Sequence, residues 1–183
     1  MTLLLSVDPG KSTGIALGYY DAITPYLLLE RWNVLGGLEG FIDWWDAAHY
    51  KDGPLSGGMH EHQYDLVVEQ FRLDSRNEFT ADLAPVQIEG AIVAKNGSTY
   101  CRPIVWQPRT DKAVLTGYPK DCVTKTQRQR HRFDFLERFG LFAAGSRNDD
   151  SNDAVCHALI FLKRAKHAPS LHAFWPQKLR LVP

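Results

Sequence analysis

The sequence begins with an apolar segment that ends abruptly at an acid, and this segment restricts how the N-terminal part can fold. Leu3 to Val7 is apolar except for Ser6, Asp8 follows, and Pro9-Gly10 cannot continue a strand inside a sheet. A second apolar run, Ile15 to Tyr20, starts too soon for a crossover helix, so the two runs are predicted to form an antiparallel hairpin. Asp8 then lies at a strand end, where it either caps the turn or holds a metal ion.

Length and composition are those of one globular domain. The chain has 183 residues, 44% hydrophobic and 23% charged, and no apolar run approaches the ~20 residues of a membrane span. The N-terminus lacks the features of a signal peptide, so we expect a cytoplasmic protein that does not bind membranes. Residues 1–100 carry 6 basic and 14 acidic side chains (net −8), whereas residues 101–183 carry 15 and 7 (net +8). The basic half is compatible with a polyanionic partner if its charges gather on one face.

Hydrophobic periodicity predicts an α/β domain in which a meander of three strands is followed by alternating strands and helices. Strands are predicted at 3–8, 15–20, 26–32, 65–71 and 102–107, and helices at 38–50, 76–96, 133–140 and 151–165. Residues 1–167 are expected to form the domain and residues 168–183 a C-terminal tail. The tail is too proline-rich for assignment of helices, and we expect its Trp175 to pack back on the sheet.

Four acids stand at the ends of these predicted elements. Asp8 and Glu69 end strands, and Asp150 and Asp153 begin the last helix with the i, i+3 spacing that places both on one face. Asp149 is adjacent but does not share this face with that spacing, so Asp150 is chosen. Crowded carboxylates raise each other's pKa unless cations occupy the cluster. Oxygen ligands suit Mg²⁺ or Mn²⁺, and two such ions about 3.5–4 Å apart can activate a water and stabilise the leaving oxygen in phosphoryl displacement.

Other motifs near these acids support different functions less well. Gly10-Lys11-Ser12-Thr13 ends like a P-loop, but Leu5 stands where that loop needs a glycine, so no nucleotide cofactor is expected. The actin-like ATPase fold also starts with an Asp-x-Gly hairpin, but it normally needs two related domains. His60-Glu61-His62 lies in a Gly-rich loop, where such residues are more often solvated than bound to a metal.

The motifs, in their order along the chain, resemble those of the RuvC-like Holliday junction resolvases of the RNase H-like superfamily, and phage-borne members in particular. The matching segments extend from residue 3 to about residue 165. One departure is that the phage members commonly share Trp-Gln-x-Pro, whereas this chain has no residue between Gln107 and Pro108. The matching segments are Asp8-Pro9-Gly10 with Thr13-Gly14, Val67-Val68-Glu69-Gln70-Phe71, Trp106-Gln107-Pro108 and Asp150-x-x-Asp153-Ala154.

This resemblance implies an RNase H-like fold: a five-stranded mixed sheet, with three antiparallel N-terminal strands and then parallel strands, flanked by helices. It also implies a homodimer, located in the cytoplasm of a bacterium or of a phage-infected host cell, that resolves Holliday junctions and other branched DNA by two-metal-ion hydrolysis. Asp8 and Glu69 look like the first two ligands of Mg²⁺ or Mn²⁺, Asp153 like the third, and Asp150 like the position where family members have Asp or His. Gly14, like Gly10, is expected to leave room for a metal-bound phosphate.

Candidate DNA-binding residues lie on both sides of this set of acids. Phe71 is either a core residue or a wedge into the junction, and the basic stretch from Thr110 to Arg132 either tracks phosphates or forms a solvated face. Lys112 or Lys125 is expected near the scissile phosphate. The full set is Phe71, Arg72, Arg76, Lys112, Lys125, Arg128, Arg130 and Arg132.

Substrate choice stays open at this point. An RNase H-type nuclease on RNA–DNA hybrids or a flap endonuclease would use the same acids, and a catalytically silent DNA-binding or interaction module of the same fold is a further alternative.

Overall fold

The computed structural model describes residues 1–56, 64–71, 83–96, 103–145 and 148–176. The strands in these ranges are β1 (Thr2–Asp8), β2 (Ser12–Tyr20), β3 (Leu27–Leu35), β4 (Tyr64–Gln70) and β5 (Val105–Pro108). The helices there are α1 (Gly37–His49), α2 (Ala84–Asn96), the 3₁₀ turn η1 (Arg109–Asp111), α3 (Lys112–Thr116), α4 (Lys125–Arg138), α5 (Asp149–Arg164) and α6 (Ala168–Phe174). None of the helices in these ranges is both long and apolar enough to cross a membrane.

The five strands form one open mixed sheet in the order β3-β2-β1-β4-β5. The first three strands pair antiparallel as a meander, and β4 and β5 then add to β1 in parallel. This is the predicted fold class, including the change from antiparallel to parallel pairing.

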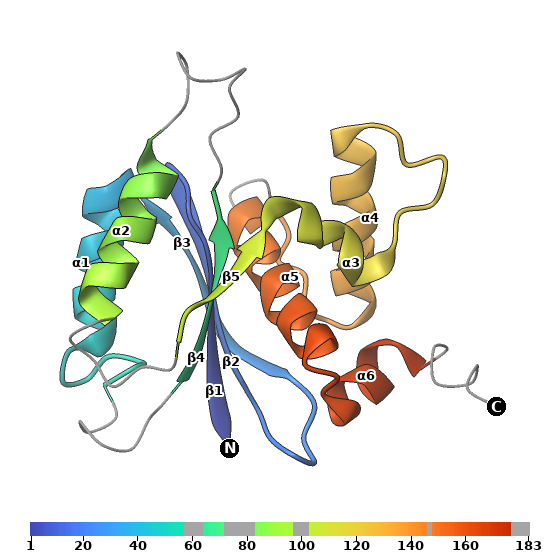
Figure 1. Ribbon diagram of the computed structural model, residues 1–183, viewed down its shortest axis with the longest axis horizontal. Helices are drawn as coiled ribbons and strands as arrows, with labels where there is room; N and C mark the ends of the chain where they lie inside the picture. Colours follow the sequence, from blue (N-terminus) through green and yellow to red (C-terminus); the bar gives the residue numbers. More distant parts are fainter. Residues whose placement is uncertain (57–63, 72–82, 97–102, 146–147, 177–183) are drawn as a thin grey trace.

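Helices cover both faces of the sheet (Figure 1). On one side α1 and α2 enclose a core that contains Leu5 and Val7. On the other side α5, with α4 and α6 beyond it, encloses a core that contains Leu4 and Val67. Because β1 is buried on both faces, its sequence is almost continuously apolar, as expected for a central strand. Asp8 is therefore the first acid at the exit of a buried strand.

Helix α4 starts earlier than its apolar residues indicate. The predicted helix began at Phe133, whereas α4 begins at Lys125. A capping box explains the difference: the Thr124 hydroxyl accepts from the Gln127 backbone N–H at 3.2 Å, and the Gln127 side chain accepts from the Thr124 N–H at 2.9 Å. The basic residues from Lys125 to Arg132 are thus helical, and their side chains point to several sides of α4.

One further helix prediction is confirmed over the described residues, and the C-terminal tail is more ordered than predicted. Of the helix predicted over 76–96, the described part is α2, with Pro85 in its first turn, and residues 76–82 lie outside the described ranges. The C-terminal tail contains α6, and Trp175 after it is buried as expected. Its indole N–H donates to the Leu115 carbonyl at 2.9 Å and its ring stacks on Phe135, so it packs on α3 and α4 rather than on the sheet.

Candidate active site

The strand register brings two of the predicted acids to one edge of the sheet. Val7 pairs with Val68, so Asp8 and Glu69 follow at the carboxyl ends of neighbouring parallel strands, and Glu69 pairs in turn with Gln107. Residues that adjoin across a sheet point to the same face. Ser6, two residues before Asp8, donates to the Ala154 carbonyl of α5 at 2.8 Å, which identifies that face as the one α5 covers. The carboxylates of Asp8 and Glu69 therefore point toward the beginning of α5.

A close contact between β2 and α5 brings the third acid to the other two. A Cβ on Gly14 would lie 1.9 Å from the Asp150 carbonyl oxygen, so only glycine allows the helix to approach the hairpin this closely. This corrects the expectation that Gly14 leaves room for a phosphate, since the α5 backbone takes that room. The Asn33 side chain also accepts from the Ser151 N–H at 2.9 Å. The start of α5 is thereby fixed, and Asp153 lies one turn along it, facing the acids of the sheet.

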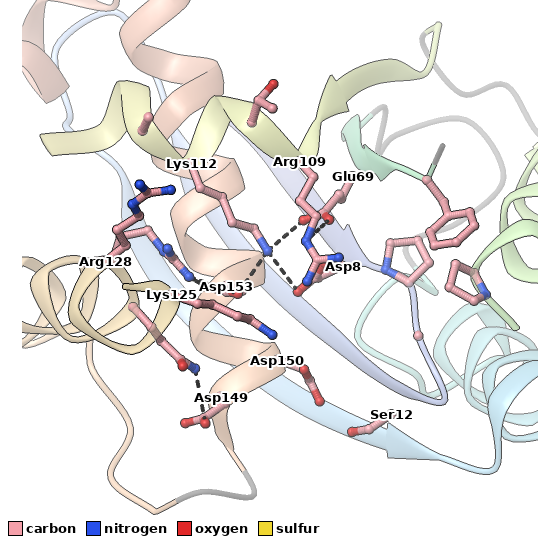
Figure 2. Close-up of a pocket in the computed structure, with 18 of the residues that line it drawn as sticks. Asp8, Ser12, Glu69, Arg109, Lys112, Lys125, Arg128, Asp149, Asp150 and Asp153 are labelled. Carbon is pink, nitrogen blue, oxygen red and sulfur yellow. Dashed lines mark hydrogen bonds and ion pairs between the residues drawn. The ribbon is translucent and has the colours of Figure 1, made fainter. Parts of the chain in front are cut away.

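The side chain of Lys112 ends among the three acids. Its Nζ lies 2.6 Å from Glu69 Oε2, 2.9 Å from Asp153 Oδ2 and 3.4 Å from Asp8 Oδ2. Lys112 is only 7% exposed, although it begins a short helix at the surface. Figure 2 shows its stem passing inward to the carboxylates. Lys112 is thus a counter-ion of the acids, and its predicted contact with the scissile phosphate stays a prediction.

Burial and charge act in opposite directions on the pKa values of these groups. Burial raises the pKa of Asp8 well above its usual range, and the neighbouring Glu69 and Asp153 charges add to this while Lys112 opposes it. Burial acts on Glu69 and Asp153 in the same sense, but hydrogen bonds and cations outweigh it and hold both pKa values low. Burial would lower the pKa of Lys112, yet the three carboxylates raise it. The ammonium therefore stays charged at neutral pH.

Arg132 supplies a second buried cation. Its guanidinium donates to Asp153 Oδ1 at 3.0 Å and to the Tyr118 hydroxyl at 3.0 Å, and the residue is 8% exposed. Arg132 was predicted to contact DNA from a basic surface. The structure places it in the floor of the site, where it contacts both oxygens of Asp153 and shares Oδ2 with Lys112, and its contact with DNA stays a prediction.

His157 and Gln107 complete the site and were not identified from the sequence. His157 Nε2 lies 2.7 Å from Glu69 Oε2, and its Nδ1 lies 2.8 Å from the side-chain oxygen of Gln107. The donor atoms of Asp8, Glu69 and His157 all lie within 4.8 Å of one another, close enough to share one metal ion. The available signal was helical spacing, because His157 follows Asp153 by four residues and thus shares its face.

The acids form the floor of a pocket of about 980 Å³. Lys125 and Arg128 line it from α4, as the DNA-binding prediction requires, and the half-buried Phe71 lines it from the end of β4. Arg130 is not part of the lining; it points to the exposed side of α4 and pairs with Asp134 at 2.7 Å. The pocket is therefore acidic at its floor and basic along one wall. Arg72, Arg76 and the His60-Glu61-His62 motif lie outside the described residues.

Comparisons with known proteins concern the fold of the chain. No family model and no curated protein matches the chain. Among solved structures, RuvC of Thermus thermophilus matches with a TM-score of 0.59 at 16% identity, over 91% of this chain and 98% of the other. The chain has the RuvC fold. RuvC from the same organism in complex with a Holliday junction substrate gives 0.60 at 12% identity over 92% and 98%. The Fowlpox virus resolvase in complex with Holliday junction DNA gives 0.58 at 12% over 90% and 99%. The predicted RuvC-like form of the RNase H-like fold is confirmed.

Asp149 and Asp150, both in the first turn of α5, line the pocket in this RuvC fold. Asp149 accepts a hydrogen bond from Gln129 of α4 at 3.2 Å, and burial together with the Asp150 and Asp153 charges raises its pKa. Figure 2 shows the Asp150 side chain on the Ser12 side of the pocket, apart from Lys112. Asp149 is thus engaged with α4, and Asp150 stays the predicted ligand.

The donor set fits a divalent cation. Asp8, Glu69 and Asp153 come from three different elements and already surround one buried positive charge, that of Lys112. Carboxylate oxygens in an open-sided cluster suit Mg²⁺ or Mn²⁺. Asp150 lines the same pocket, so its carboxylate could bind the ion as a fourth ligand from the solvent side.

Proposed function

We propose that the protein is a Mg²⁺- or Mn²⁺-dependent endonuclease that cuts branched DNA, with Holliday junctions as its main substrate. The observation that carries this proposal is a cluster of three carboxylates at the floor of a pocket with a basic wall. Asp8, Glu69 and Asp153 all meet there around the ammonium of Lys112. The RuvC fold supports the choice of substrate, since two of the similar structures are complexes with Holliday junction DNA.

In this proposal each side chain has a defined task. Asp8, Glu69, Asp153 and Asp150 would hold the ions, which when bound supply the Lewis-acid chemistry for hydrolysis of a phosphodiester. Lys112 neutralises the acids from within the fold and so limits their repulsion. The cationic side chains on the pocket wall would bind the phosphates of the strand that enters.

We further propose a homodimer formed through α2. Leu83, Val86 and Val93 are 54%, 41% and 53% exposed, and their spacing, together with Gly90, follows the a/d pattern of helices that pair. The opposite side of α2 packs inward through Ile88 and Ile92. A second copy is the occupant we expect, because a four-way junction has two-fold symmetry and two symmetric cuts need two sites.

Cleavage of a matched substrate panel tests the activity. Four-way, flap, RNA–DNA hybrid and linear substrates of the same sequence are incubated with the protein and Mg²⁺, Mn²⁺ or EDTA. We expect symmetric nicks in the four-way junction that require the metal and are abolished by Asp8→Asn, whereas Asp43→Asn on the exposed side of α1 cuts normally. A preference for hybrids would favour the RNase H-type alternative. A wild-type protein that cuts none of the four would favour the silent binding module.

Sedimentation with and without junction DNA tests the dimer. Val86→Glu and Val93→Glu should shift the protein to a monomer because they place charge on the proposed seam. Val123→Glu, at a site 70% exposed just before α4, should leave the mass unchanged. A wild-type protein that stays monomeric even on the junction would contradict symmetric resolution.

A further inference from the structure

His157 is fully buried beside the acids, and both of its ring nitrogens have polar contacts. Nε2 faces Glu69 Oε2 at 2.7 Å and Nδ1 faces the Gln107 side chain at 2.8 Å. The Gln107 amide nitrogen also donates to the backbone carbonyl of His157 at 3.3 Å. Gln107 thus contacts both the ring and the backbone of His157, and the ring is held between β5 and the Glu69 carboxylate.

The chemistry of the ring favours a donor toward Glu69. A carboxylate oxygen can only accept, so the ring nitrogen that faces Glu69 Oε2 carries a proton. A hydrogen bond to a carboxylate is stronger than one to a neutral amide, which places this proton on Nε2. Nδ1 faces the side-chain oxygen of Gln107, and the donation from the Gln107 amide nitrogen to the His157 carbonyl fixes that carboxamide, so Gln107 holds the plane of the ring.

We propose that His157, supported by Gln107, is a positioning residue that holds the Glu69 carboxylate in the orientation in which it binds a divalent ion; this rests on the proposed metal-dependent function. A glutamate side chain loses several rotamers when it binds a metal, and a prior hydrogen bond reduces that entropic cost. Lys112 also contacts Glu69 Oε2, but its ammonium is carried on a flexible stem and contacts two other acids as well. The His157 ring is rigid and packed on all sides, so it fixes the direction of the carboxylate.

Two substitutions at His157 separate positioning from packing. In His157→Gln the amide nitrogen lies near the position of Nε2 and still reaches Glu69, whereas in His157→Asn it lies near Nδ1, facing Gln107, and does not reach Glu69. We expect His157→Asn to bind Mn²⁺ about 10–100-fold more weakly than wild type and His157→Gln to bind within about threefold of wild type. Binding is measured without DNA, from the electron paramagnetic resonance signal of free Mn²⁺.

His167→Asn is the matched control. His167 also has two polar contacts, to Ser170 Oγ at 2.8 Å and the Asp21 carbonyl at 2.7 Å, but it lies beyond the end of α5, away from the acids. Its substitution should leave Mn²⁺ affinity unchanged. Urea unfolding of all three variants identifies any general loss of stability.

The outcomes distinguish this inference from the proposed function. Equal Mn²⁺ affinities of His157→Asn and His157→Gln would overturn the positioning role of His157. A ¹⁴N coupling to Mn²⁺ in spin-echo spectra of wild type that disappears in His157→Asn would also overturn it, because His157 would then be a ligand itself. A wild-type protein that binds no Mn²⁺ would overturn both. A protein that shows the expected contrast in affinity yet cuts no DNA would refute the endonuclease and leave positioning supported.

Discussion

Replacing Lys112 with methionine removes the charge at the centre of the acids while keeping an unbranched apolar stem. The ammonium lies 2.6–3.4 Å from three carboxylates that are largely buried. At an effective dielectric constant of about 20, each such contact corresponds to roughly 5 kcal/mol of Coulomb attraction, from which the desolvation of the ammonium must be subtracted. Protonation of Asp8, whose pKa is already raised, limits the loss further.

The expected net effect is a loss of about 3–5 kcal/mol in the free energy of unfolding, the usual result of removing one partner of a buried ion pair. For a domain of this size that corresponds to a fall in Tm of roughly 6–20 °C. Lys125→Met is the matched control, because Lys125 lines the same pocket but is exposed at its wall. Its effect should stay within about 0.5 kcal/mol of wild type.

A divalent ion should recover much of the stability lost in Lys112→Met. The ammonium and the ion act on the same carboxylates, so the presence of one weakens the binding of the other. Thermal unfolding in EDTA and in a Mg²⁺ series should therefore show a larger rise in Tm for Lys112→Met than for wild type. The reasoning is refuted if Lys112→Met in EDTA is as stable as wild type, or if Mg²⁺ stabilises wild type at least as much as the variant.

Three further predictions follow from single features of the fold. Gly14→Ala should lower the free energy of unfolding by about 1–3 kcal/mol and weaken Mg²⁺ binding, because its Cβ would displace the α5 backbone at Asp150; unchanged urea unfolding would contradict the close contact. Burial lowers the pKa of His49, so the stability it contributes is present above about pH 6.5 and lost as pH falls toward its lower folded pKa. Between pH 8 and pH 5.5 the urea midpoint of unfolding should thus fall less steeply for His49→Phe than for wild type. Equal slopes of midpoint against pH in the two proteins would contradict this. Lys125→Ala with Arg128→Ala should weaken junction binding and reduce the slope of log Kd against log salt by about 2, whereas an unchanged slope would remove this wall from the DNA interface.

The sequence alone determined the layers of the fold and the acids at its centre, because these depend on local patterns. Continuous apolar runs predict buried central strands, and the breaks after them place Asp8 and Glu69 at strand ends. The helical spacing of the apolar residues in the last helix is also a local pattern, and it predicts that Asp153 lies on the inward face. The start of α4 was also readable in principle from Thr124 and Gln127, although its polar composition concealed it.

Only the tertiary structure decided which other side chains meet these acids. Lys112 and Arg132 belong to a basic stretch that was predicted either to track phosphates or to form a solvated face. Packing of α3 and α4 against α5 turns these two inward, while Arg130 stays exposed. His157 was not identified from the sequence, because only the register of β4 and β5 brings Glu69 and Gln107 to it. Contacts between residues 41 to 104 positions apart leave no local pattern, since they depend on how helices dock on the sheet. The hairpin whose first strand ends at Asp8 was therefore predictable. The counter-ion Lys112 and the contact of His157 with Glu69 were not.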